Sequence, residues 1–243
     1  MKSDSFLSLT VLLPIINETK SLIKTINIIE SENKNQIEQY ILICHPSKTK
    51  HESIEICDRF VKKNPRKFKK IYQKLPFLGG AIRNGFEHVF TSHCLMMSSD
   101  LETDPQTVKS MVKLIAISPQ SIITATRWVR DNDFNNYGLL KKNLNYIFQK
   151  LFSFIYQTKL SDLTFGYRLF PTKLVKKINW EMYDHSFLFE TIIKPLKMKI
   201  NIIEVSSPWH KRIEGVSSNM TLNYIKYFYI GFKTIFMDKE KNE

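Results

Sequence analysis

The chain has 243 residues, of which 43% are hydrophobic and 24% charged, as in ordinary globular proteins with one sizeable core. No apolar stretch reaches the roughly 18 uninterrupted residues of a spanning helix, and we expect neither a membrane-crossing segment nor an N-terminal export signal. The net charge of +13 favours anionic partners, which are nucleic acids, phosphorylated substrates or acidic lipid headgroups.

Strands and helices alternate through the first half of the chain. In chain order, the pattern predicts a strand at 8–14, a helix after residue 18, a strand at 39–44, a helix around 54–61, a strand at 68–72, a helix from 79 to about 89, a strand at 94–98, a helix at 105–117 and a strand at 121–126. This alternation implies an α/β fold with a mainly parallel, doubly wound sheet flanked by helices. Ligands of such sheets bind beyond the carboxyl ends of the strands, where Pro14, Ser47, Asp100 and Arg127 are expected.

The second half of the chain is more aromatic. It predicts a long helix at 139–157, a loop at 160–170, a helix at 186–197, a strand at 200–205, a basic loop at 210–218 and an amphipathic C-terminal helix within about 220–238. The two aromatic helices also carry lysines, which fits either core packing or helices that lie on a membrane surface. We expect one domain over residues 1–243, with its core at about 8–218. Cys44, Cys57 and Cys94 form no metal-type spacing and indicate reduced core residues in a cytosolic protein.

An acidic segment follows the strand predicted at 94–98. Asp100 and Glu102 stand at alternate positions, so in an extended segment their carboxylates point the same way. Hard divalent cations are held by such oxygens and keep open positions for substrate phosphates. The plainer interpretation is that Asp104 caps the next helix and the other acids are solvated.

Several short motifs, taken together and in order, resemble one family. They lie at residues 13–18 (Leu-Pro-Ile-Ile-Asn-Glu), 79–86, 98–105, 126–127, 162–168 (Asp-Leu-Thr-Phe-Gly-Tyr-Arg) and 212–218 (Arg-Ile-Glu-Gly-Val-Ser-Ser). On these residues the chain resembles the family 2 glycosyltransferases of GT-A fold, and most closely the polyprenol-phosphate hexose synthases.

The resemblance implies an enzyme, an inverting and metal-dependent glycosyltransferase that moves a hexose from a nucleotide-sugar donor to a polyprenyl phosphate acceptor. It implies Mg²⁺ or Mn²⁺ as cofactor, with Asp100 and Glu102 as metal ligands. The expected catalytic residues are Asp100, Arg127, Asp162 and Arg168. The expected donor-binding residues are Pro14, Asn17, Glu18, Ser47, Gly80, Arg83, Ser98 and Arg212. A lipid-phosphate acceptor and the basic charge together lead us to expect a cytoplasmic protein attached peripherally to an anionic membrane.

Two positions depart from the family pattern. The family carries an acidic pair after the second strand, where this chain has Cys44 and His45, and Ser98 replaces the first acid of the metal motif. Both departures favour an alternative, a degenerate and non-catalytic relative that binds a sugar nucleotide or a partner protein. A nucleic-acid-binding protein is not expected, because the basic residues are dispersed and form no groove-reading or base-stacking motif.

Some of these residues also have purely structural interpretations. Arg127 could be a solvated charge at a strand end, and Asp162 could stabilise an ordinary turn of its own loop. Arg83 could simply decorate a helix start. The pair Gly79–Gly80 could be a helix-entry turn, or it could let the backbone approach a phosphate.

Overall fold

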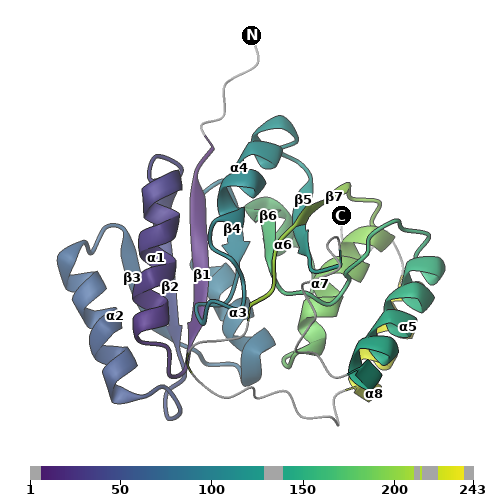
Figure 1. The fold of residues 1–243 in the computed structure, drawn as a ribbon, viewed down its shortest axis with the longest axis horizontal. Coiled ribbons are helices and arrows are strands. Elements are labelled where there is room, and N and C mark those ends of the chain that lie inside the picture. The colour runs from purple at the N-terminus through teal and green to yellow at the C-terminus, as the bar shows by residue number, and fades with distance from the viewer. Residues whose placement is uncertain (1–6, 129–138, 211–213, 215–223, 238–243) are drawn as a thin grey trace.

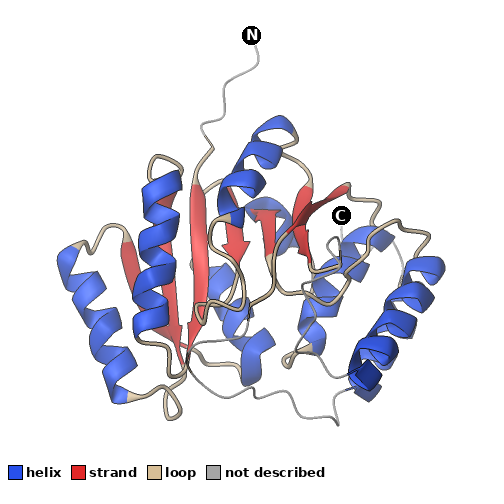
Figure 2. Cartoon of the chain, viewed as in Figure 1, coloured by secondary structure: helices blue, strands red, loops and turns tan. Residues whose placement is uncertain are grey.

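The computed structural model describes residues 7–128, 139–210, 214 and 224–237. They form a seven-stranded sheet in the order β3-β2-β1-β4-β6-β5-β7, with helices on both faces (Figure 1, Figure 2). The strands are β1 (Leu9–Ile15), β2 (Ile37–Cys44), β3 (Phe68–Tyr72), β4 (His93–Met96), β5 (Ile122–Thr126), β6 (Arg168–Pro171) and β7 (Ile202–Ser206). The helices are α1 (Lys20–Asn33), α2 (His51–Lys63), α3 (Phe77–Glu87), α4 (Thr107–Ile117), α5 (Leu139–Ile155), α6 (Thr172–Lys177), α7 (Ser186–Lys197) and α8 (Tyr224–Ile235).

The sheet is mainly parallel, as predicted. β1 pairs in parallel with β2 and β4, β2 with β3, and β5 with β7. Only β6, among the described strands, runs antiparallel, between β4 and β5. The carboxyl ends of β1, β2, β4 and β5 therefore meet at one edge of the sheet.

The sequence prediction was wrong at residues 168–170, and it assigned no element to residues 171–177. The segment up to residue 170 was predicted to be loop, yet Arg168–Pro171 forms β6, and the six-residue α6 follows it. Both elements are too short to show a period, and β6 is buried along its whole length, so it lacks the alternation that marks a half-exposed strand.

Helices cover the two faces of the sheet because each central strand is apolar on both sides. Leu9, Val11 and Leu13 of β1 pack in one cluster with α1, α2 and α4, while Leu12 packs on the other face with α3 and α7. This double burial explains why the strand is a nearly continuous apolar run rather than an alternating one.

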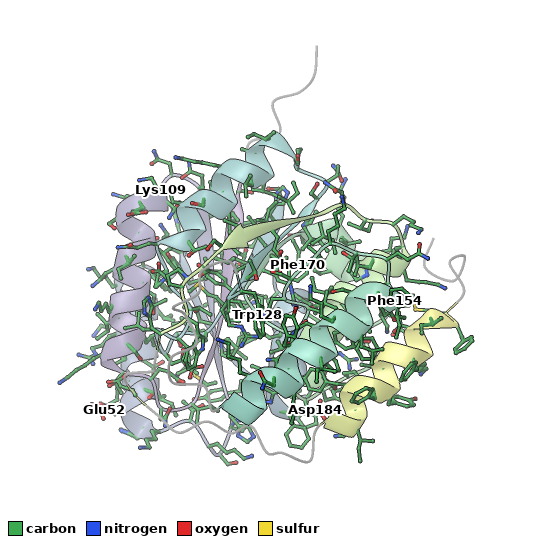
Figure 3. All side chains as sticks on the ribbon, turned by 45° about the vertical axis from the view of Figure 1, so that its right-hand side comes forward. Glu52, Lys109, Trp128, Phe154, Phe170 and Asp184 are labelled. Atoms are coloured by element: carbon green, nitrogen blue, oxygen red, sulfur yellow. The ribbon has the colours of Figure 1, made fainter. Side chains whose placement is uncertain are left out.

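A third apolar cluster joins α5, α7 and α8 at one end of the molecule. Phe152 of α5 lies at its centre and contacts Phe189 of α7 with ring centroids 4.9 Å apart and Phe228 of α8 at 5.7 Å. Gly231 of α8 permits this approach, because a Cβ there would lie 2.3 Å from the Phe152 ring. α5 and α8 consequently lie side by side (Figure 1, Figure 3).

Candidate active site

The loops that follow β1, β2 and β4 are joined at the carboxyl edge of the sheet. The Ser99 hydroxyl lies 3.4 Å from the Pro14 carbonyl, which ties the loop after β4 to the end of β1. The Lys50 amide donates to the Ile16 carbonyl at 2.7 Å and ties the loop after β2 to the same place. Pro14, Ser47 and Asp100 are thus brought to one edge, as the sequence predicted.

Asp100 is held rigidly in this edge. Its side chain is only 5% exposed, and its Oδ1 accepts hydrogen bonds from the Ser98 hydroxyl at 2.6 Å and the Glu102 amide at 3.0 Å. Leu101 between them has φ 65°, in the left-handed region that leucine rarely adopts. The backbone therefore folds back around the Asp100 carboxylate instead of continuing the strand.

Segments from the far end of the chain border the same loop. The His210 amide donates to the Glu102 carbonyl at 3.2 Å, and Trp209 forms an isolated β-bridge with Thr103. The Thr103 hydroxyl lies 3.0 Å from that of Ser98. The segment after β7 therefore lies against the acidic loop.

Glu18 brings a second carboxylate toward Asp100. Its Oε2 accepts the amides of Ile16 at 2.7 Å and Asn17 at 3.0 Å, so it caps the loop after β1. Burial raises the pKa of Glu18, and the neighbouring charge of Asp100 raises it further, while the backbone donors oppose both. A cation between these two acids would relieve their repulsion.

The residues at this edge fit a hard divalent cation that takes few protein ligands and leaves most of its coordination shell open. Within the described ranges no group of three or more histidine, cysteine, aspartate or glutamate side chains converges. Asp100 supplies a preorganised carboxylate, and the half-buried Glu102 is two positions away. Magnesium-type cations bind in this manner, through one or two carboxylates with water and substrate phosphates completing the shell.

Arg127 and Asp162 form a two-point ion pair at the end of β5. Arg127 Nε lies 2.7 Å from Asp162 Oδ2, and Arg127 Nη2 lies 3.0 Å from Oδ1. The same guanidinium stacks over the Phe165 ring, 4.7 Å from its centroid. Burial alone would raise the pKa of Asp162, but Arg127 and the Thr164 amide outweigh it and hold that pKa below its ordinary value. Arg127 is therefore not a solvated strand-end charge.

The placement of Arg168 requires a correction. It was predicted to be a catalytic phosphate clamp, yet it is fully buried within β6. Its guanidinium donates to the Thr124 hydroxyl and the Leu163 carbonyl, each at 3.0 Å, and also to Leu188 and Thr191 of α7. Burial lowers its pKa. A guanidinium whose donors are used in this way fixes the 160–167 loop to the sheet and α7 instead of contacting a ligand.

Gly80 also differs from its prediction as a donor-binding residue, and Arg83 lies one turn further along α3. The Gly80 amide donates to the Tyr183 carbonyl at 2.9 Å, and a Cβ on Gly80 would lie 2.7 Å from the Leu75 carbonyl carbon. The glycine thus serves close packing inside α3 and has no free amide for a phosphate. Arg83 stacks over the Tyr183 ring at 4.4 Å and its Nη1 donates to the Met182 carbonyl at 3.5 Å, and its contact with the donor stays a prediction. Arg212 lies outside the described residues.

Three polar residues that the sequence analysis did not predict hold these loops. Glu204 of β7 accepts the amides of Ser161 and Asp162, with Oε1 2.9 and 3.0 Å from them. Gln149 of α5 accepts the Leu163 amide at 2.8 Å. Each contact joins positions that are 14 or more residues apart, which no local pattern reveals.

The third such residue is Glu214, whose carboxylate caps the N-terminus of α1. It accepts the Thr19 and Ser21 amides at 2.8 and 3.1 Å and both of their hydroxyls at 2.8 Å. Burial opposes ionisation, but these donors lower the pKa of Glu214 to about 2. The helix end that follows β1 is therefore occupied by the chain's own carboxylate.

Comparison with known proteins agrees with this architecture. The family model described as "Glycosyl transferase family 2" matches residues 10–179, which is most of the chain. The chain belongs to glycosyl transferase family 2. This glycosyltransferase is 22% identical over 252 residues to a dolichyl-phosphate beta-glucosyltransferase of Saccharomyces cerevisiae, covering 93% of this chain and 73% of the relative.

Solved structures show the same GT-A fold. The glucosyl-3-phosphoglycerate synthase of Mycobacterium tuberculosis in complex with UDP superposes with a TM-score of 0.68 at 11% identity, covering 96% of the glycosyltransferase and 82% of that chain. The same synthase with Mn²⁺, UDP-glucose and phosphoglyceric acid gives a TM-score of 0.68 at 11% identity, covering 96% and 81%. Family and fold therefore agree with the resemblance drawn from the motifs.

Proposed function

We propose that this glycosyltransferase moves a hexose, with inversion, from a nucleotide-sugar donor to a polyprenyl phosphate. The observation that carries the proposal is the rigid Asp100 carboxylate at the carboxyl edge of β4, with Glu18 on one side and the Arg127–Asp162 pair beyond β6 on the other. The S. cerevisiae relative, which is named for a dolichyl-phosphate substrate, supports a lipid-phosphate acceptor.

Asp100, with Glu102 as a second ligand, would hold Mg²⁺ or Mn²⁺. The bound cation would stabilise the negative charge that develops on the departing nucleoside diphosphate. The Mn²⁺ and UDP-glucose complex of the structural neighbour supports a donor and a metal of this kind. Ser98 contributes a hydroxyl that hydrogen-bonds Asp100, so the charge at the site comes from the acids.

A lipid phosphate is already an anionic nucleophile near neutral pH. The enzyme then needs to position it and to balance charge, and no strong general base is required. Arg127 is the candidate to face it, because Asp162 and Phe165 fix its guanidinium at the end of β5. Asp162 engages Nε and Nη2, and a guanidinium carries five N–H donors in all, so a phosphate oxygen would be bound through Nη1.

The face formed by α5 and α8 supports delivery of the acceptor from a membrane. Several large apolar side chains of these helices are exposed: Leu144, Tyr146, Ile147, Leu151, Phe154, Ile225, Phe228, Tyr229, Phe232 and the adjacent Phe236. Both helices contain lysines and no acidic residue, although the two lysines of α8, Lys226 and Lys233, pair with Asp184 and Glu181. Phe154, labelled in Figure 3, is 83% exposed. Basic, aromatic faces of this type favour an anionic membrane surface. No helix of the described ranges is long and apolar enough to cross a bilayer.

A screen of radiolabelled nucleotide sugars against polyprenyl phosphate and soluble phosphate acceptors tests the proposal. Transfer to the lipid, lost in Asp100→Asn, supports it. Transfer only to a soluble acceptor would refute the lipid part. Binding of a nucleotide diphosphate with no turnover of any donor would instead establish the alternative, a non-catalytic relative.

A further inference from the structure

The two sides of α5 differ in character. Large apolar side chains, spaced as on one face of a helix, are exposed at Leu144, Ile147, Leu151 and Phe154. Gln149 lies on the opposite side and is only 3% exposed. A buried polar side chain costs stability unless its hydrogen bonds are made, so the partners of Gln149 show what the inner side of α5 holds.

The side-chain amide of Gln149 has a fixed orientation. Its Oε1 accepts the Leu163 amide at 2.8 Å, and only the oxygen end can accept a hydrogen bond from a backbone N–H. Nε2 donates to the Thr164 hydroxyl at 2.9 Å and lies 3.4 Å from Asp162 Oδ1. It also donates to Asn145 Oδ1 at 2.9 Å, one turn earlier on α5. The inner side of α5 is therefore bonded to the loop that precedes β6.

The two loop side chains that Gln149 Nε2 contacts also hold Arg127. Arg127 Nη2 lies 3.0 Å from Asp162 Oδ1 and 3.4 Å from the Thr164 hydroxyl oxygen. The Thr164 hydroxyl in turn donates to Asp162 Oδ1 at 3.3 Å. The Gln149 amide and the Arg127 guanidinium therefore share the same two oxygen atoms, and removing the amide takes away one of the groups that fix these side chains.

A ring contact joins α5 to the residue after Arg127. The centroid of the Trp128 ring, labelled in Figure 3, lies 5.8 Å from that of Tyr146. α5 thus reaches the end of β5 at two places, once beside Arg127 and once through the partners of Arg127. The guanidinium is consequently oriented relative to α5 as well as to the sheet.

We propose that Gln149 is a positioning residue for the acceptor. It orients Arg127 relative to α5, so that the phosphate of a lipid lying on the outer side of α5 meets the guanidinium in one geometry. The assignment rests on the proposed lipid-phosphate acceptor and adds the residue that links the lipid-facing helix to the phosphate-facing arginine. Its effect belongs to the acceptor, because β6 separates β5 from β4, after which Asp100 and the expected donor diphosphate lie.

Substitutions separate positioning from ordinary loop packing. Gln149→Leu keeps a side chain of similar size and removes both polar ends. Gln149→Glu keeps an oxygen for the Leu163 amide, but it donates to Asp162 only while it is protonated, since an ionised carboxylate is an acceptor alone. Ser153→Ala is the matched control. The Ser153 hydroxyl of α5 donates to the Leu160 carbonyl at 3.0 Å, so it ties the same helix to the same loop two residues before Asp162.

Initial rates of transfer from UDP-glucose to polyprenyl phosphate, with each substrate varied in turn, measure the two sides of the site. In Gln149→Leu, kcat/KM for the lipid should fall about tenfold or more, the value of one good hydrogen bond, while the KM for UDP-glucose should stay within about twofold. Ser153→Ala should keep both values. Equal losses toward both substrates in Gln149→Leu, or the same loss toward the lipid in Ser153→Ala, would overturn the assignment while leaving the proposed function in place.

The pH dependence of Gln149→Glu gives a readout that a general loss of packing would not move. Burial and the neighbouring charge of Asp162 raise the pKa of the new carboxyl group, which can donate to Asp162 only below that pKa. The kcat/KM for the lipid in Gln149→Glu, divided by that of the wild type, should therefore rise as the pH falls from about 8 to about 6. A ratio that stayed constant or fell would overturn the assignment.

A further measurement does not depend on catalysis. ¹H–¹⁵N spectra of the arginine Nε–H groups, assigned with Arg127→Lys, report how fast each proton exchanges with water. The Arg127 proton should exchange faster in Gln149→Leu than in the wild type and Ser153→Ala, and equal exchange in all three proteins would overturn the assignment. If exchange differed as expected but the wild type transferred no hexose to a lipid phosphate, the proposed function would fall and the acceptor role of Gln149 with it, which distinguishes that result from a failure of Gln149 alone.

Discussion

Arg127 and Asp162 are locked together by two parallel hydrogen bonds, and the side chains are 11% and 0% exposed. The pair joins the end of β5 to the loop that precedes β6. Glu204 holds the same loop from β7 by accepting the Asp162 amide. One guanidinium at the proposed acceptor side is thus given a fixed orientation by two strands and a loop, which is the preorganisation that charge stabilisation needs.

Removing the charge of Asp162 should destabilise the protein strongly. Asp162→Asn leaves the buried guanidinium of Arg127 without its counter-ion, and breaking a buried pair in this way costs about 3–5 kcal/mol. Urea denaturation measures the free energy of unfolding. The matched control is Lys109→Ala, which removes an exposed ion pair in which Lys109 Nζ lies 4.0 Å from Glu32 Oε2. It should change the free energy of unfolding by less than about 1 kcal/mol. Equal losses in the two variants would contradict this account of the pair.

The Glu214 cap should stabilise the protein only where its carboxylate is ionised. Its folded pKa of about 2 is below the ordinary glutamate value of about 4.3, so the stabilisation is complete above about pH 4.3 and is lost as the pH falls toward 2. Glu214→Gln should therefore lower the stability by about 1 kcal/mol at neutral pH and converge on the wild type in acid. Thermal unfolding of both proteins at several pH values between 2.5 and 7 measures this difference in stability. A difference that grew as the pH fell would contradict the account.

Gly80 should be required for packing and not for phosphate binding. Its new Cβ in Gly80→Ala would meet the Leu75 backbone, which cannot move easily, so we expect a loss of about 1–3 kcal/mol in unfolding free energy. In Gly166→Ala the new Cβ meets only the flexible end of Leu188, so the loss should be smaller. Denaturation curves measure both. If Gly80→Ala kept full stability but lost nucleotide binding, Gly80 would instead contact the donor phosphate as first predicted.

The α5–α8 face should bind anionic vesicles. Phe154→Ser and Phe236→Ser each remove an aromatic group that is more than 80% exposed. Each should weaken binding by roughly 10- to 150-fold, since burying a phenylalanine contributes roughly 1.5–3 kcal/mol. Ile117→Ser is the control, because Ile117 of α4 is 80% exposed elsewhere on the surface. Sedimentation with phosphatidylglycerol vesicles measures the binding. Equal weakening by all three substitutions would argue against a specific face.

Local patterns predicted most of the fold. β1 is an apolar run because both faces are buried, and α1 places Leu22, Ile26 and Ile29 on one buried side, so each could be predicted from its own residues. The edge that gathers Pro14, Ser47 and Asp100 followed from the alternation of strands and helices.

The misassigned residues depend on partners that lie far away in the chain. Arg168 resembles a ligand-binding arginine by its motif, but its role is set by Thr124, Leu163 and α7, which surround it only in the folded state. Glu214 accepts hydrogen bonds from Thr19, Lys20 and Ser21, which lie 193 to 195 positions earlier in the chain. Spacing along the chain carries no signal of such contacts.

The most direct test of the central claim is transfer of radiolabelled glucose from UDP-glucose to polyprenyl phosphate, followed by extraction of the lipid product. Asp100→Asn keeps an oxygen for the Ser98 and Glu102 donors, so the fold should survive, while the loss of charge should abolish metal-stimulated transfer. Asp104→Asn, whose Oδ1 accepts the Gln106 amide, is the neighbouring control and should stay active. We predict that only the wild type and Asp104→Asn form labelled lipid. Undiminished transfer by Asp100→Asn would contradict the account.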